Sequence, residues 1–371
     1  MVKGAREVYP PNRTRQSREP SGRFPMSIRS AINRLPVDRF LLMMIATIAL
    51  AAFLPARGQV AEAFDWVVFG AIALLFFLYG ARISPQAVWA GLLHWRLQGL
   101  VFLSTFLLFP LIGLVAAPIA DAVLPAELAF GILFVTLLPS TVQSSIAFTS
   151  IAGGNVPAAL TSASVSNLLG VLVTPALVLL LAHAQGGGFS FDAITKIAVQ
   201  ILVPFALGQL FRPLIGGWLG RHKKLTQVVD RGSILLVVYA AFSEGMVAGV
   251  WSQLEFGDLA TVVAFDIVIL AIVLAFTTAA ARIFGFSKPD EIAIVFCGSK
   301  KSMATGIPMA GILFPGHALA LIVLPLMLFH QIQLFACATL AQRYSRQTAA
   351  VPETTAAEAM NKEQEAVGLK V

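Results

Sequence analysis

The chain has 371 residues, of which 57% are hydrophobic and only 12% are charged, and its mean hydropathy is +0.82. Soluble domains carry about 25% charged residues, so most of this chain is expected to lie in lipid. The net charge of +7 does not indicate nucleic-acid binding, because the basic residues cluster between apolar segments, as they do in cytoplasmic loops of membrane proteins.

The apolar segments alternate with short polar ones along the chain. A membrane-crossing helix needs roughly 20 mostly apolar residues. The predicted crossing segments are 39–55, 65–83, 97–119, 127–152, 156–182, 192–212, 229–251, 258–284, 291–313 and 317–341. The polar ends, residues 1–38 and 344–371, are expected to be disordered tails, and the basic N-terminal tail is expected near anionic lipid.

The distribution of Lys and Arg predicts the orientation. With ten crossings both termini lie on one side, and 22 of the 26 basic residues then fall on the cytoplasmic side, against Arg57 and Lys196 outside. This bias predicts cytoplasmic termini. The composition is that of an integral membrane protein, which we expect in a bacterial inner (plasma) membrane. Cys297 and Cys337 lie apart in apolar segments, so neither a disulfide nor a metal site is expected.

Ten helices divide into two halves, residues 39–182 and residues 192–341. Five helices is an odd number, so a duplicated second half enters the membrane upside down. Inverted repeats of this kind are typical of secondary transporters, whose sites lie where interrupted helices meet. The predicted fold class is therefore an all-α membrane protein of two inverted five-helix repeats.

The fourth predicted helix of each half is interrupted by polar residues, PSTVQSS at 139–145 and CGSKKS at 297–302. Proline removes a backbone donor and glycine weakens a helix. Such a break deep in a membrane is tolerated only inside protein or beside a water-filled cavity. A single break is more often a packed kink, but two matched breaks favour a binding site near the midplane.

We predict that substrate- or ion-binding residues lie in these interruptions and on two neighbouring helices, with no catalytic residue and no metal site. The predicted residues are Ser140, Thr141, Gln143, Ser144, Ser145, Ser299, Lys300, Lys301, Ser302, Glu244 and Asp266. In the last predicted helix, His330, Gln331 and Gln333 favour interhelical hydrogen bonding over lining a site. The hydroxyl-rich run 161–166 favours close helix packing over ligand binding.

The chain resembles the bile acid:sodium symporter family, and within it the sodium/bile acid cotransporter 7-like subgroup, in the stretches 75–84, 137–177, 239–246 and 296–314. The resemblance implies a panel built from helices 1, 2, 6 and 7. It also implies a core built from helices 3–5 and 8–10, in which unwound helices 4 and 9 cross. Substrate would lie in the cleft between panel and core, with organic-anion entry coupled to two sodium ions behind the crossing.

The chain departs from this family at the expected sodium ligands. Cys297 and Lys301 stand where the resemblance places a Glu and a Gln, and residues 144–145 (Ser-Ser) replace a Ser-Asn pair. Ala159 and Ala163 stand where two hydroxyl ligands are expected. Sodium needs hard oxygen ligands and would be repelled by ammonium groups, so sodium is a disfavoured partner and no other cofactor is expected.

Lys300 and Lys301 admit three interpretations. A charge at a helix centre costs ~2.5–3.5 kcal/mol on insertion scales, which favours a functional role. One lysine could supply the charge that sodium supplies in the family and couple transport to protons by releasing its own. Alternatively, one lysine attracts an anion in the cleft, or both pair with Glu244 or Asp266 and only stabilise the bundle.

The sequence therefore predicts a secondary active transporter that moves a small organic anion by alternating access, proton-coupled or independent of sodium. A membrane regulatory protein in ion homeostasis and an anion channel remain alternatives. An intramembrane enzyme is not indicated, because no HExxH or GxSxG motif is present. The expected partners are the lipid bilayer and the anion, and the oligomeric state is left open.

Overall fold

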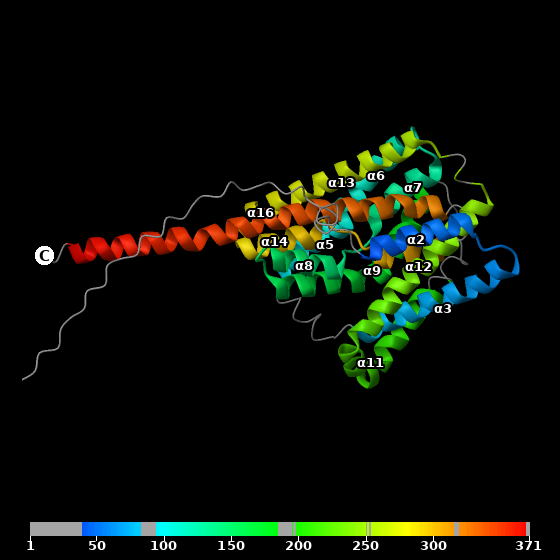
Figure 1. Cartoon of the computed structure of the whole chain (residues 1–371), viewed down its shortest axis with the longest axis horizontal. Coiled ribbons are helices and arrows are strands. Elements are labelled where there is room, and N and C mark those ends of the chain that lie inside the picture. Colours follow the sequence, from blue (N-terminus) through cyan, green and yellow to red (C-terminus); the bar gives the residue numbers. More distant parts are fainter. Residues whose placement is uncertain are drawn as a thin grey trace, which may run out of the picture. The chain divides into compact units, whose positions relative to one another are not determined.

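A computed structural model describes residues 39–82, 94–184, 195, 198–249, 251, 254–314 and 319–368. Within these residues the regular secondary structure is entirely helical, as Figure 1 shows. Every predicted apolar segment is helical over most of its described length. The N-terminal tail predicted for residues 1–38 lies outside the described residues.

The helices are named here in chain order. They are α2 (Arg39–Phe53), α3 (Gln59–Arg82), α5 (Trp95–Leu103), the π-helical turn η1 (Ser104–Leu108), α6 (Phe109–Asp121), α7 (Ala126–Leu137), α8 (Val142–Ile151), α9 (Val156–Ala184), the π-helical turn η2 (Ala198–Leu202), α11 (Val203–Arg221), α12 (Lys223–Val247), α13 (Phe256–Ile283), α14 (Lys288–Gly298), α15 (Met303–Leu313) and α16 (Leu319–Gly368).

The length and apolar character of the helices identify an integral membrane protein. In the part of the chain that the structure describes, seven helices are long and apolar enough to cross a membrane, or eight if the bent pair α7–α8 is one crossing. Large apolar side chains such as Leu42, Leu111 and Leu214 point outward and are exposed. An apolar exterior of this extent suits contact with lipid rather than water.

Four helices, α2, α3, α11 and α12, pack against one another, and we call them the panel. α3 contacts α11 and α12, and α12 also contacts α2. The approach of α3 and α11 is close, because a Cβ atom on Gly208 would collide with the backbone carbonyl of Phe77. Small residues at such crossings let two membrane helices pack backbone to backbone.

The remaining helices form a second group, which we call the core. Its helices pack in pairs that include α6–α7, α13–α14, α7–α16, α9–α14, α8–α9 and α15–α16. Panel and core meet where α12 contacts α15 and α16. Figure 1 shows the short helices α8 and α14 beside each other in the core.

The last helix, α16, continues to Gly368, through a segment in which composition predicts disorder from residue 344. Its apolar part ends near Gln347, and the rest is rich in Ala, Thr and Glu. A helix without packing partners is marginal in water, so disorder of this tail in solution stays a prediction.

Candidate functional site

Two helix breaks define the candidate site. α7 ends at Leu137 and α8 begins at Val142, and we call residues 138–141 the first break. α14 ends at Gly298 and α15 begins at Met303, and we call residues 299–302 the second break. The second break lies within the predicted interruption and the first begins one residue before it, whereas three predicted residues, Gln143, Ser144 and Ser145, belong to the first turn of α8.

Local sequence explains why the helices stop there. Leu138 adopts an extended backbone (φ −78°, ψ 155°), as residues before proline generally do. At the second break Ser302 starts α15 as its N-cap, and its hydroxyl accepts a hydrogen bond from the backbone N–H of Thr305 at 3.2 Å. Serine is among the residues most favoured at this position.

The two breaks bond directly to each other. The backbone N–H of Ser302 donates to the carbonyl of Pro139 at 2.8 Å. The hydroxyl of Thr141 donates to the carbonyl of Lys301 at 2.7 Å, and the hydroxyl of Ser140 donates to the carbonyl of Cys297 at 2.6 Å. Backbone groups freed by each break are therefore paired inside protein, as membrane depth requires.

The Lys301 ammonium group lies at the end of α7 and uses all three of its donors. It donates to the backbone carbonyls of Leu138 at 2.6 Å, Thr136 at 2.8 Å and Thr105 at 3.0 Å. The Phe109 ring lies below it, with the nitrogen 3.9 Å from the ring centroid. The positive charge thus meets the negative end of the α7 dipole. Lys301 is fully buried.

The backbone of Lys301 is held by a side chain from α16. The amide oxygen of Gln333 accepts from the Lys301 N–H at 2.9 Å, and the Gln333 NH₂ group donates to the Lys301 carbonyl at 2.9 Å. The same NH₂ group lies 2.9 Å from Nδ1 of His330. Gln333 therefore replaces the backbone partners that the second break removes, in agreement with its predicted interhelical bonding.

Lys300 is also fully buried, but its surroundings differ from those of its neighbour. Its nitrogen has no hydrogen-bond partner among the described residues. It lies 4.0 Å from the centroid of the Phe148 ring on α8 and 5.4 Å from that of Phe296 on α14. Two aromatic faces offer cation–π attraction to an ammonium group, yet they cannot satisfy its three donors.

Serine hydroxyls bond to the carbonyls at the end of α14. Ser145 donates to the carbonyl of Phe296 at 3.0 Å, and Ser104 donates to that of Gly298 at 2.9 Å. With Ser140 on Cys297, three consecutive carbonyls of α14 are covered by hydroxyls. The C-terminal carbonyls of the two helices therefore have different partners. Those of α7 include an ammonium group as donor, whereas those of α14 bond to neutral hydroxyls.

α9 supports the first break from the other side. The hydroxyl of Ser166 accepts from the backbone N–H of Ser140 at 3.1 Å, and the hydroxyl of Thr174 donates to the carbonyl of Leu137 at 2.8 Å. Gly170 lies between them, and a Cβ atom there would collide with the Pro139 ring. This part of the predicted hydroxyl-rich helix thus combines close packing with hydrogen bonding.

The structure does not join the other predicted residues to this network. Gln143 and Glu244 are exposed, and the Ser299 hydroxyl donates to the carbonyl of Val295 in the preceding α14 at 2.6 Å. The buried Ser144 hydroxyl and both carboxylate oxygens of buried Asp266 have no hydrogen-bond partner in the described part of the chain. Within the described residues, neither lysine forms an ion pair with Glu244 or Asp266.

Cys297 packs mainly among small apolar side chains. Cys297, Ala159 and Ala163 are fully buried in one hydrophobic cluster with Ile294. The Cys297 thiol lies 3.5 Å from the Ala159 carbonyl. No group of three or more His, Cys, Asp or Glu residues that could hold a metal ion occurs in the part of the chain the structure describes.

Sequence reasoning missed the partners of Lys301 on the third predicted helix. The carbonyl of Thr105 belongs to the π-helical turn η1, and Phe109 begins the helix that follows. π-Helical turns are frequent at functional sites. The available signal was the polar pair Ser104-Thr105 within an otherwise apolar stretch.

Comparison with known proteins gives consistent matches over most of the chain. A model of the SBF-like CPA transporter family matches residues 38–346. The uncharacterized protein PA2026 of Pseudomonas aeruginosa is 57% identical over 310 residues, which cover 83% of this chain and 93% of that protein. YfeH of Escherichia coli, named as a candidate symporter, is 51% identical over 312 residues, 84% and 94% of the two chains. Sodium/bile acid cotransporter 7-A of Xenopus laevis is 28% identical over 310 residues, 82% and 90% of the two chains.

Proposed function

The chain belongs to the SBF-like CPA transporter family, and on that premise we propose that it is a secondary active transporter in which the Lys301 ammonium replaces a bound sodium ion. The family match confirms the resemblance found in the sequence. The single observation that carries the proposal is the fully buried Lys301 nitrogen on three backbone carbonyls at the helix breaks.

The proposed topology has ten crossings. α2 is apolar but only 15 residues long, and α14 and α15 are each 11 residues long. We add α2 as one short crossing and α14–α15 as one broken crossing to the eight others. The break in α14–α15 corresponds to the break in α7–α8, and the cytoplasmic bias of Lys and Arg then places both termini inside.

An inverted repeat is supported by the pattern of helix contacts. If the two halves correspond helix by helix, the α6–α7 contact matches α13–α14, and α7–α16 matches α14–α9. In the panel, α2 corresponds to α11 and α3 to α12, so the α2–α12 contact matches the α3–α11 contact. Sites of transporters built this way lie at the repeat interface, where half-helix ends meet, which is where the two breaks bond to each other.

Replacement of sodium is favoured by two groups of residues at which the family resemblance implies ligands. At one, Lys301 brings its own positive charge to a cluster of carbonyls, so a mobile cation is not needed there. At the other, Cys297, Ala159 and Ala163 form an apolar cluster in place of the oxygen ligands that sodium requires. The tethered ammonium would hold the crossing together without sodium.

We propose a small organic anion as the substrate and the boundary between panel and core as its path. Transporters of this kind work by rocking one helix group against the other. α12 and α15 form part of this boundary, and α15 starts at the second break. Proton coupling would follow if a buried lysine released its proton during the cycle, with unpaired Lys300 the better candidate because no hydrogen bond holds its charge.

The proposal is tested by replacing sodium with choline. In proteoliposomes, uptake of radiolabelled taurocholate and small dicarboxylates should be equal in the two salts, and strict sodium dependence would contradict the proposal. The thermal unfolding temperature of the purified chain needs no substrate and should also be the same in both salts. The double variant C297E/K301Q, which introduces the residues the resemblance implies, should acquire stabilisation by sodium, whereas the control C297E/K300Q should not.

A further inference from the structure

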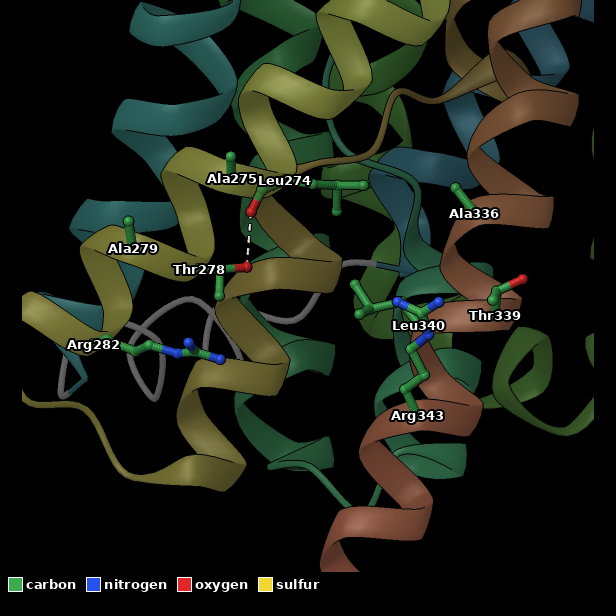
Figure 2. Close-up of a pocket in the computed structure, with 9 residues that line it drawn as sticks. All are labelled: Leu274, Ala275, Thr278, Ala279, Arg282, Ala336, Thr339, Leu340 and Arg343. Atoms are coloured by element: carbon green, nitrogen blue, oxygen red, sulfur yellow. Dashed lines mark hydrogen bonds between the residues drawn. The ribbon is translucent and has the colours of Figure 1, made fainter.

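A groove opens between α13 and α16, outside the residues that join the two breaks. Its volume is about 630 Å³, within the range of small-molecule sites. It is lined by Leu274, Ala275, Thr278, Ala279, Arg282, Ala336, Thr339, Leu340 and Arg343, which Figure 2 shows as sticks. These residues come from the last turns of α13 and the middle of α16, and they belong to two unlike sets.

One set forms an apolar floor. Ala275 and Ala279 are small and exposed on α13, and Leu340 lines the groove from α16. The threonines of the floor satisfy their own hydroxyls: Thr278 donates to the carbonyl of Leu274 at 2.7 Å (Figure 2), and Thr339 donates within α16. The floor therefore offers no free donor and suits a hydrocarbon chain.

The other set is positively charged. Arg282 and Arg343 are exposed at the same end of the groove. Arg282 is ion-paired with Glu291 at 3.2 Å, but the same carboxylate also accepts from Lys288 at 2.8 Å and from the Tyr344 hydroxyl at 2.9 Å, so two basic residues share one negative charge. Arg343 forms no ion pair with any residue that the structure describes. An excess of positive charge is thus left facing outward.

We propose that this groove binds one anionic phospholipid, with the phosphate on Arg282 and Arg343 and an acyl chain along the alanine floor. Basic pockets between membrane helices on the cytoplasmic side recognise anionic headgroups in this way. The guanidinium group suits the phosphate, because its planar donors can bind two oxygens together. The assignment to the cytoplasmic leaflet rests on the topology proposed above. The lipid site itself does not depend on that topology.

Native mass spectrometry of the delipidated full chain tests the charge. Phosphatidylglycerol should bind more tightly than phosphatidylcholine. Arg343→Gln should weaken phosphatidylglycerol binding about fivefold, since one basic residue near a membrane surface contributes about that factor. Arg346→Gln is the matched control, because Arg346 is exposed one turn further along α16 and does not line the groove.

A second pair of variants tests the floor without altering charge. Ala279→Leu fills the groove and should reduce phosphatidylglycerol binding. Ala271→Leu, on an exposed face of the same helix but outside the groove, should not. Thermal unfolding of each variant shows whether it is folded, and the Ala279 pair keeps the test valid if Arg343→Gln does not fold.

Three results would overturn the lipid site. Equal binding of phosphatidylcholine would remove the role of charge. An equal loss in Arg346→Gln would reduce the effect to general surface charge. Competition by glycerol 3-phosphate as strong as that by the whole lipid would show that the acyl chain takes no part. None of these results bears on sodium independence, so the two proposals fail separately.

Discussion

Lys300 and Lys301 are adjacent in the chain, yet their ammonium groups lie in different environments. The second break is not helical, so neighbouring side chains can leave the backbone in different directions. The Lys301 ammonium group lies near the end of α7, where three backbone carbonyls accept hydrogen bonds from it. The Lys300 ammonium group lies beside two aromatic rings and has no hydrogen bond among the described residues. The two lysines should therefore respond differently to the same substitution.

We predict that Lys301→Met destabilises the protein and that Lys300→Met does not. Loss of the Lys301 ammonium leaves buried carbonyls unpaired, at about 1–3 kcal/mol each, so a decrease of about 3 kcal/mol in the free energy of unfolding is expected. Lys300→Met removes a buried charge without hydrogen bonds and should be neutral or stabilising. Unfolding of both variants in detergent, followed by tryptophan fluorescence, measures the difference. Equal losses would contradict the different roles.

At this scale the sequence predicted two polar breaks, one of them carrying both lysines, but not which lysine contacts which group. The partners of Lys301 lie far away in the chain, at Thr105, Thr136 and Gln333. Two of these three offer only a backbone carbonyl, a group that every residue carries. No pattern of residue types could identify them. The suggested pairing with Glu244 or Asp266 relied on charge alone and does not occur in the described residues.

Each broken helix depends on a partner element to bond the backbone groups that the break frees. The first break relies on α9 and the second break, and the second relies on α16 and the first break. The contact of α9 is the closest, because Gly170 presses against the Pro139 ring. A side chain at this position would have to push a rigid ring that is itself part of the break.

We predict that Gly170→Ala lowers the free energy of unfolding by about 1–3 kcal/mol, the usual cost of overpacking. Gly99→Ala is the matched control, since a Cβ atom there meets nothing within 4 Å, and alanine in a helix interior should stabilise by about 1 kcal/mol relative to glycine. Chemical denaturation of both variants gives the two values. A Gly170→Ala protein as stable as the wild type would show that the helices can separate freely.

The positions of the elements were largely predictable, because apolar run length and the Pro and Gly signals act locally. Pro139 and Gly298 placed both breaks to within a few residues. The π-helical turn η1 was not predictable, since its residues STFLL carry no proline or glycine. Its contacts are with distant segments: the Ser104 hydroxyl donates to the carbonyl of Gly298 at the end of α14, and the Thr105 carbonyl accepts from the Lys301 ammonium group.

For the whole molecule, the proposed inverted repeat assigns the same pattern of helix contacts to two halves of unlike sequence. Hydropathy predicted the segments and the bias of Lys and Arg predicted their sidedness, but the division into panel and core came only from the family resemblance. Packing between segments depends on side-chain shape, which apolar composition does not record. The short helices α2, α14 and α15 are the elements whose crossing most needs a direct test.

The sidedness of α16 decides whether α14–α15 crosses the membrane. We predict that Phe284 and Arg346, both exposed, face the cytoplasm and that Ala122 faces outward. If α14–α15 entered and left on one side, α16 would run in the opposite direction and Arg346 would lie outside. Single cysteines at these positions, in a chain with Cys297 and Cys337 replaced by alanine, can be labelled in intact cells with a charged maleimide. Of the three variants, only Ala122→Cys should react before the cells are lysed. Labelling of Arg346→Cys in intact cells would exclude the inverted repeat, because the fourth helix of the second half would then not match that of the first.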